Sequence, residues 1–83
     1  MRMIAISSNL DIHTGFKLAG VECHLAKAAD ELPVILGAIQ SVENIGIMAV
    51  SDEFINLEPM KNFLEGNPQI LHLAVSSNWN CVG

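Results

Sequence analysis

The sequence has few positively charged residues. Its 83 residues include four lysines and arginines against nine aspartates and glutamates, which gives a net charge of −5. A protein that binds nucleic acid needs a basic face to neutralise the phosphates of the backbone. So few cations in an acidic chain do not provide such a face, and we therefore expect no nucleic-acid partner.

Cysteine is also scarce. Cys23 and Cys81 lie far apart, and neither belongs to a Cys-x-x-Cys pair. This spacing gives no support to a structural zinc site or a redox motif, and it favours two buried or free thiols over a disulfide, as in a reducing compartment. His13 and His72 have no partners at the spacing of metal ligands. We expect neither a metal nor a cofactor.

Long apolar runs are absent. The apolar runs are far shorter than the ~20 residues that a membrane span requires, and charged residues are interspersed throughout. The apolar segment Met1–Ile6 is followed at once by three polar residues and is too short for a signal peptide. These patterns predict a globular cytoplasmic protein that does not insert into the membrane.

Four short apolar segments are typical of strands. Arg2–Ser7 is apolar and ends in polar residues, as a strand buried on both faces does. Val21–Ala26 alternates apolar and polar residues, which predicts a strand at the edge of the sheet. Ile45–Val50 is almost wholly apolar and predicts a central strand. Gln69–Val75 is the last predicted strand.

In the segments between the predicted strands, apolar residues recur at helical spacing. A first helix follows Asp11, its expected N-cap. A second extends from Asp30, again an expected cap, to about Glu43, with Pro33 in its first turn. Pro59 interrupts the third segment, so we expect a broken helix there.

Strands that alternate with helices predict an α/β fold. The expected architecture is a small four-stranded parallel sheet flanked by helices, in the receiver-like or Rossmann-like order β-α-β-α-β-α-β. We expect a single domain over residues 1–75. Residues 76–83 have no apolar periodicity and are expected to form a C-terminal tail. Its Trp79 either folds back over the sheet edge or contacts a partner.

Two glycines fall within or beside the first predicted helix. Gly15 shares the apolar face of this helix with Phe16, so we expect it to lie against the sheet, where its missing side chain lets the two backbones approach. Gly20 stands where a left-handed residue ends a helix. Val21 is then placed to contact Phe16, as in a Schellman ending.

No catalytic motif is complete. The chain has neither the Gly-x-Gly-x-x-Gly run of a dinucleotide site nor a P-loop, and the first strand ends in Ser7, Ser8 and Asn9 instead of the carboxylates of a phosphate-accepting receiver. Cys23 and His24 are neighbours on a strand, so their side chains point to opposite faces and cannot share a proton. We therefore predict a packed thiol, an exposed imidazole and no catalytic residue.

The segment TGFKLAGV, residues 14–21, resembles the signature near the N-terminus of the F-subunit family of the V-type and archaeal A-type ATPases. The resemblance extends to the apolar strand before it, to NIGIMAVSDEF at residues 44–54 and to NPQILHL at residues 67–73, in the order of the family. Where the family commonly has a Gly-Asp pair, this chain has Ser8 and Asn9. The signature residues are Thr14, Gly15, Phe16, Leu18, Ala19 and Gly20.

The resemblance implies a non-catalytic member of the central rotor stalk. Such a protein lies beside the coiled-coil, D-type stalk subunit of a V/A-type ATPase that transports protons or sodium ions, in the cytoplasm and peripheral to the membrane, and it couples or regulates ATP turnover and ion transport. The family commonly continues into a C-terminal helix that these 83 residues do not include, so we expect weak contact with the catalytic head. The alternative is a standalone regulatory module that binds a small ligand near Ser7–Asp11 and Val50–Asp52.

Overall fold

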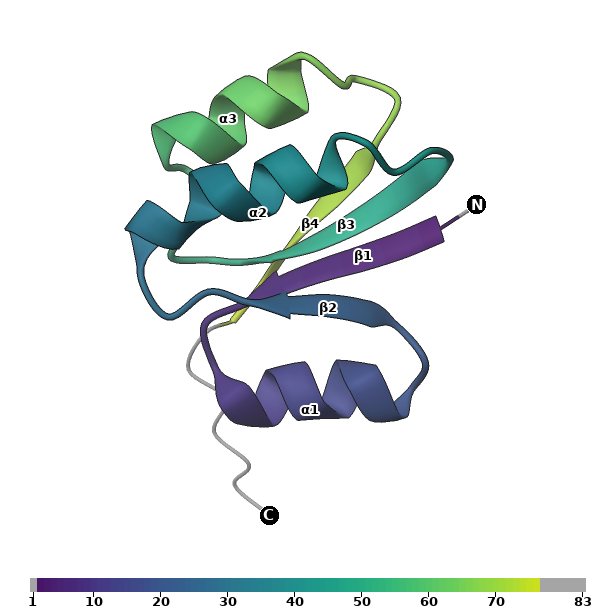
Figure 1. Ribbon diagram of the computed structural model, residues 1–83, viewed down its shortest axis with the longest axis vertical. Helices are drawn as coiled ribbons and strands as arrows, with labels where there is room; N and C mark the ends of the chain where they lie inside the picture. Colours follow the sequence, from purple (N-terminus) through teal and green to yellow (C-terminus); the bar gives the residue numbers. More distant parts are fainter. Residues whose placement is uncertain (1, 77–83) are drawn as a thin grey trace.

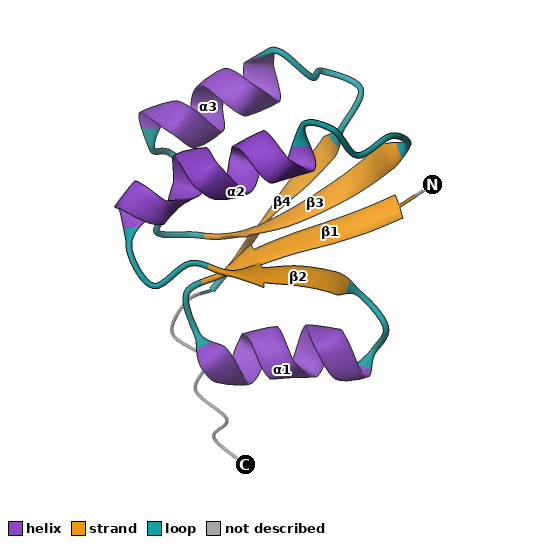
Figure 2. Cartoon of the chain, in the orientation of Figure 1, coloured by secondary structure: helices purple, strands orange, loops and turns teal. Residues whose placement is uncertain are grey.

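The computed structural model describes residues 2–76, in which strands and helices alternate along the chain (Figures 1 and 2). In chain order the elements are β1 (Arg2–Ser7), α1 (Leu10–Leu18), β2 (Glu22–Leu25), the 3₁₀ turn η1 (Ala29–Glu31), α2 (Leu32–Ile39), β3 (Ile45–Ser51), α3 (Glu58–Glu65) and β4 (Leu71–Val75). The strands form one parallel sheet in the order β2-β1-β3-β4. Figure 1 shows α1 on one face of this sheet and α2 and α3 on the other. The predicted α/β fold is confirmed.

The central strands β1 and β3 are covered on both faces. Successive side chains of a strand point to opposite faces, so each strand contributes to two layers. Toward α1 the strands present the small residues Ala5 and Ala49. Toward α2 and α3 they present the large side chains of the main core, which are Ile4, Ile6, Met48 and Val50. The predicted central position of β3 is confirmed, because it pairs with both β1 and β4.

The two edges of the sheet are β2 and β4. The edge position predicted for the segment that contains β2 is confirmed. β4 begins at Leu71, two residues later than predicted, because Ile70 belongs to a turn in which its N–H donates to the carbonyl of Asn67 at 3.0 Å. Leu71 and Leu73 remain 60% and 46% exposed. β4 therefore presents leucines to solvent.

Asn9, not Asp11, caps α1. The Oδ1 atom of Asn9 accepts hydrogen bonds from the backbone N–H groups of Asp11 at 2.8 Å and Ile12 at 3.4 Å. The helix therefore begins at Leu10. The prediction for Asp11 was wrong because an aspartate within the first turn, where it favours the helix dipole, has the same sequence pattern as a cap.

The second helix is shorter than predicted at both ends. Asp30 lies inside the 3₁₀ turn and is not a cap. Glu31 occupies the N-cap position of α2 but makes no side-chain cap bond to this helix. Its carboxylate Oε2 instead accepts from the N–H groups of Lys27 at 2.7 Å and Ala28 at 3.0 Å, which precede the 3₁₀ turn. Pro33 lies in the first turn, as predicted. The helix ends at Ile39 rather than near Glu43, because the chain must turn there to enter β3.

Only the second half of the predicted broken helix is helical. Residues 52–56 form successive turns that begin with the hydrogen bond from the N–H of Phe54 to the carbonyl of Ser51 at 2.9 Å. Pro59 then stands at the start of α3, where its missing N–H costs little. The turns let Phe54, which is 4% exposed, reach the main core.

Gly20 ends α1 as predicted. Its φ angle is +83°, in the left-handed region that favours glycine. The N–H of Gly20 donates to the carbonyl of Lys17 at 3.0 Å, and the N–H of Val21 donates to that of Phe16 at 2.9 Å. These two bonds make up a Schellman ending. Phe16 and Val21 pack against the same small cluster of the core.

Two sequence predictions concern regions at the limits of the structure. The domain predicted for residues 1–75 ends where β4 ends. Trp79 and all of the predicted tail except Ser76 lie outside the described residues. Within residues 2–76, no helix has the length and apolar character needed to cross a membrane.

Candidate functional site

The carboxyl end of β1 carries polar side chains that serve the local backbone. The Ser7 hydroxyl donates to the carbonyl of Asn9 and accepts from its N–H, both at 3.1 Å, and the Asn9 side chain caps α1. At the end of β3, the buried Ser51 Oγ has no hydrogen-bond partner within residues 2–76. The neighbouring Asp52 donates its N–H to the carbonyl of Val75 at 2.8 Å. Bonds within residues 7–12 and the bond from Asp52 to Val75 thus hold this end of the sheet.

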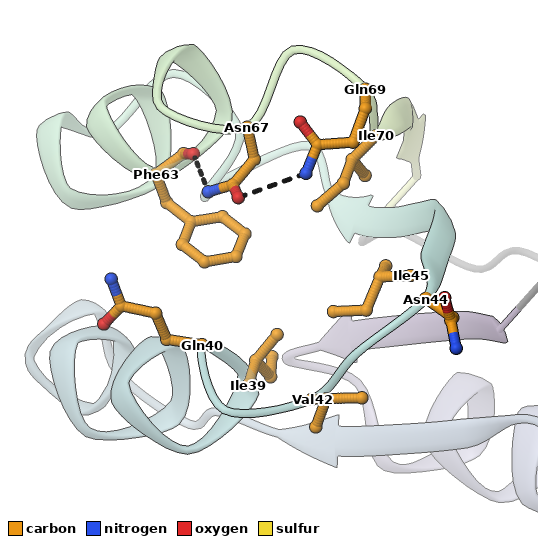
Figure 3. Close-up of a pocket in the computed structure, with 9 residues that line it drawn as sticks. All are labelled: Ile39, Gln40, Val42, Asn44, Ile45, Phe63, Asn67, Gln69 and Ile70. Atoms are coloured by element: carbon orange, nitrogen blue, oxygen red, sulfur yellow. Dashed lines mark hydrogen bonds between the residues drawn. The ribbon is translucent and has the colours of Figure 1, made fainter.

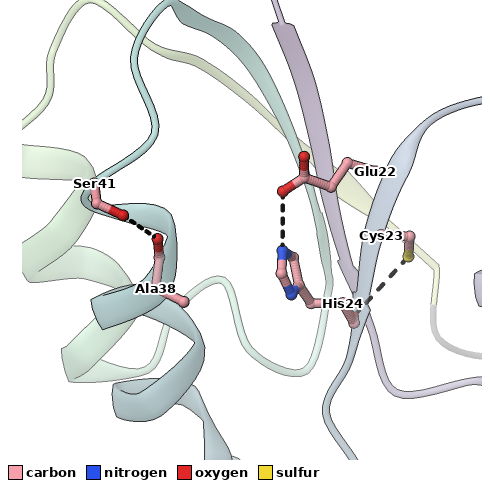
Figure 4. A network of polar contacts seen from close by, with 5 residues as sticks. All are labelled: Glu22, Cys23, His24, Ala38 and Ser41. Atoms are coloured by element: carbon pink, nitrogen blue, oxygen red, sulfur yellow. Dashed lines mark hydrogen bonds and ion pairs between the residues drawn. The ribbon is translucent and has the colours of Figure 1, made fainter.

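Cys23 and His24 point to different surroundings, as predicted (Figure 4). The Cys23 thiol is buried, and its Sγ lies 4.0 Å from the backbone carbonyl oxygen of His24 rather than near the ring. The imidazole Nε2 lies 3.3 Å from the carboxylate of Glu22 on the same face of β2. Burial raises the pKa of the Cys23 thiol, and the positive charge of Lys17 opposes this rise only in part. This thiol is poorly suited to act as a nucleophile.

A hollow of about 240 Å³ lies between the ends of α2 and α3 and the start of β3 (Figure 3). Two of its amide side chains bond to nearby groups: Asn67 Nδ2 donates to the carbonyl of Phe63 at 2.8 Å, and Gln69 Nε2 donates to Asn67 Oδ1 at 3.4 Å. It contains no ionisable side chain, since the lining residues are Ile39, Gln40, Val42, Asn44, Ile45, Phe63, Asn67, Gln69 and Ile70. We assign no chemistry to it.

A larger, apolar groove of about 380 Å³ lies on the opposite face of the sheet, between α1 and β4. We call it the α1–β4 groove, and its lining residues are Asp11, Ile12, Gly15, Phe16, Ala19 and Val75. Asp11 is the one charged residue in this lining. The other five are apolar, so the lining of the groove is almost wholly apolar.

Gly15 is open to this groove and does not lie against the sheet. Among the described residues, no atom lies within 4 Å of a Cβ atom placed on Gly15. The predicted close approach of the two backbones is therefore wrong. Phe16 packs against the small cluster of the sheet, and Ile12, one turn earlier, is buried. Gly15 is rotated about 100° from Phe16 around the helix axis.

Exposed leucines extend the apolar surface on both sides of the groove. Leu71 and Leu73 lie on the same face of β4 as Val75, because side chains at alternate positions of a strand share a face. On α1, Leu18 follows Gly15 by three residues and so lies on the same side of the helix. Leu18 is 85% exposed. The groove therefore has apolar margins on both elements.

The structure brings together part of the predicted signature. Gly15, Phe16 and Ala19 line the groove. Leu18 is exposed and, from its helical spacing, lies on the same side of α1 as Gly15. Thr14 is exposed elsewhere on α1, and Gly20 serves as the helix terminator. Sequence reasoning missed Asp11 and Val75 as groove residues. It also missed the exposed leucines Leu71 and Leu73 on the same face of β4. The available signal was a last strand without any carboxylate, lysine or arginine.

No cluster of three or more histidine, cysteine, aspartate or glutamate side chains that could hold a metal ion occurs among residues 2–76. Comparison with known proteins adds no assignment, because no family model and no curated protein matches the chain.

Proposed function

We propose that this chain is a non-catalytic protein of the F-subunit type, which docks on the coiled-coil, D-type stalk subunit of a V/A-type ATPase. The α1–β4 groove is the observation that carries the proposal. Three residues of the segment that resembles the family signature, Gly15, Phe16 and Ala19, line this groove. The sequence resemblance and the apolar surface thus fall at the same place.

The exposed leucines beside the groove favour a protein contact. Leu18, Leu71 and Leu73 are 85%, 60% and 46% exposed in the isolated chain. Leaving such side chains in water forgoes about 25 cal/mol for each Å² of apolar surface that a partner would bury. Contiguous apolar surface of this kind commonly marks an interaction site.

In this role the chain transmits or regulates and performs no chemical step. It would rotate with the coiled-coil stalk subunit, on the cytoplasmic side and peripheral to the membrane, and influence how ATP turnover is coupled to proton or sodium transport. Catalysis would belong to other components of the complex. The chain's own contribution is a rigid sheet whose one face carries the docking residues.

Co-elution tests the proposal. The purified chain and the coiled-coil stalk subunit of the same organism are mixed at about 20 µM each, a concentration at which a specific complex of ordinary affinity is nearly saturated, and separated by size-exclusion chromatography. We expect a joint peak that contains both proteins. Separate elution, with circular dichroism showing both to be folded, would remove the stalk assignment.

A small-ligand module is the second candidate, and the buried hydroxyl of Ser51 favours it. This hydroxyl lacks a partner within the described residues and lies at the carboxyl edge of the sheet, where ligands of open α/β sheets bind. The check is a nuclear magnetic resonance titration with a mixture of common metabolites. Shift changes confined to Ser7–Asp11 and Val50–Asp52 would support this candidate over the first.

A further inference from the structure

We infer that the α1–β4 groove receives a single amphipathic α-helix of the partner, which packs beside α1 across β3 and β4 and carries a lysine or arginine opposite Asp11. The inference rests on the proposed function and specifies the partner's shape and charge. It is carried by the layering of the sheet, by the small residues of α1 and by the charges at one end of the groove.

The layering of the sheet leaves room for one helix. Four parallel strands spaced ~4.8 Å apart form a sheet about 19 Å wide, and a helix is ~10 Å in diameter, so one helix covers about half of a face. On the far face, α2 and α3 together cover the core. Within residues 2–76, α1 alone lies on the near face (Figure 1). Parallel sheets are normally covered by helices on both faces.

The small residues of α1 permit a second helix to approach closely. Gly15 and Ala19 are one turn apart, and both line the groove. The space beside Gly15 is not filled by any of residues 2–76, since none of their atoms lies within 4 Å of a Cβ atom built there. Interaxial distances between packed helices fall to about 8 Å when the residues at the contact are small. An incoming helix can therefore rest on α1 while its apolar side chains reach Leu71 and Leu73.

The charges near the groove favour a basic partner. Asp11 lines the groove in the first turn of α1. Asp52 and the exposed Glu53 lie at the same end of the sheet, just after β3. The N–H of Asp52 donates to the carbonyl of Val75, which lines the groove. The chain as a whole carries a net charge of −5. A second copy of this acidic chain is a poor match, because two such copies repel each other.

Filling the groove at Gly15 tests the inference. Gly15→Arg places a long side chain in the open space, and Gly37→Arg is a matched control on α2, because Gly37 is also helical, exposed and without neighbours within 4 Å of a built Cβ. Arginine is a better helix former than glycine, so both variants should fold. We expect Gly15→Arg to weaken binding to the coiled-coil stalk subunit, measured by titration calorimetry, about tenfold or more, and Gly37→Arg to change it less than about twofold.

The charge of the partner helix is tested by Asp11→Asn. The affinity of the unmodified chain for the coiled-coil stalk subunit should fall as sodium chloride is raised, and Asp11→Asn should bind several-fold more weakly at low salt with a flatter salt dependence. Asp30→Asn, at an exposed acid in the 3₁₀ turn before α2, is the control. It should leave the salt dependence unchanged. Equal salt slopes for the unmodified chain and Asp11→Asn would overturn the basic-helix assignment.

The remaining outcomes separate the inference from the proposed function. Binding of the unmodified chain and of Gly15→Arg with equal affinity overturns the groove assignment and leaves the proposed function standing. Failure of the unmodified chain to bind the coiled-coil stalk subunit overturns the proposed function together with the assigned partner. A dimer of the chain alone that Gly15→Arg dissociates assigns the groove to a second copy. Tenfold tighter binding after removal of residues 77–83 assigns it to the chain's own terminus.

Discussion

At the scale of single residues, Cys23 shows how placement controls reactivity. The thiol lies beneath α1 and is 5% exposed. Burial raises its pKa, so the thiolate that reacts with disulfide reagents forms only at a higher pH than for a free cysteine. Lys17 reduces this effect without reversing it. Cys23 is therefore a packing residue, in agreement with the expectation from its strand position.

We predict slow, strongly pH-dependent labelling of Cys23. In a Cys81→Ser background, Ellman's reagent at pH 8 should modify Cys23 on the order of tenfold more slowly in the folded protein than in urea. Because the folded pKa is raised, the folded rate should continue to increase with pH above the range where a free thiol levels off. A folded rate equal to that in urea would mean that Cys23 is accessible.

At the scale of elements, the sequence pattern and the structure assign the N-cap of α1 to different residues. Asn9→Ala should destabilise the protein by about 1 kcal/mol, because it removes the oxygen that accepts the N–H groups of Asp11 and Ile12. Asp11→Ala should cost less, about 0.3–0.5 kcal/mol, since it loses only the interaction with the helix dipole. Urea unfolding of both variants decides between them. The reverse order would restore Asp11 as the cap.

The strands and helices also show which features of the fold can be predicted from the sequence. The apolar runs at β1 and β3 and the glycine at position 20 determine local structure by themselves, so the central strands, the fold class and the end of α1 could be predicted. The rotation of α1 could not, because Ile12, Gly15, Phe16 and Ala19 all fit one apolar stripe. Only the burial of Ile12 and the packing of Phe16 on the sheet turn Gly15 outward. The β4 half of the groove required the full strand order, which places Leu71 and Leu73 at an edge.

At the scale of the whole molecule, the excess of negative charge opposes the compact folded state. Nine carboxylates and four cations share a chain whose Cα radius of gyration is 12.1 Å over the described residues. At neutral pH their mutual repulsion destabilises the folded state. Salt should reduce this repulsion, because the Debye length falls from about 30 Å at 0.01 M to about 8 Å at 0.15 M.

We predict that salt stabilises the isolated protein. Raising sodium chloride from 10 to 300 mM at pH 7 should raise the Tm by about 4 °C, the shift that ~0.5–1 kcal/mol produces in a domain of this size. The same addition near the isoelectric point, about pH 4.8, should have a much smaller effect. Differential scanning calorimetry measures both. An equal rise at the two pH values would indicate general salting-out instead of charge screening.

The unpaired edge of β4 affects the solubility of molecules that have no partner. Within residues 2–76, β4 pairs with β3 alone, so its outer row of backbone N–H and C=O groups can accept another strand. Its sequence, Leu-His-Leu-Ala-Val, has neither the lysine nor the proline that commonly protects such a strand from edge-to-edge aggregation. Overproduced without a partner, the chain should enter inclusion bodies, and His72→Lys, at an exposed position, should keep more of it in the soluble fraction.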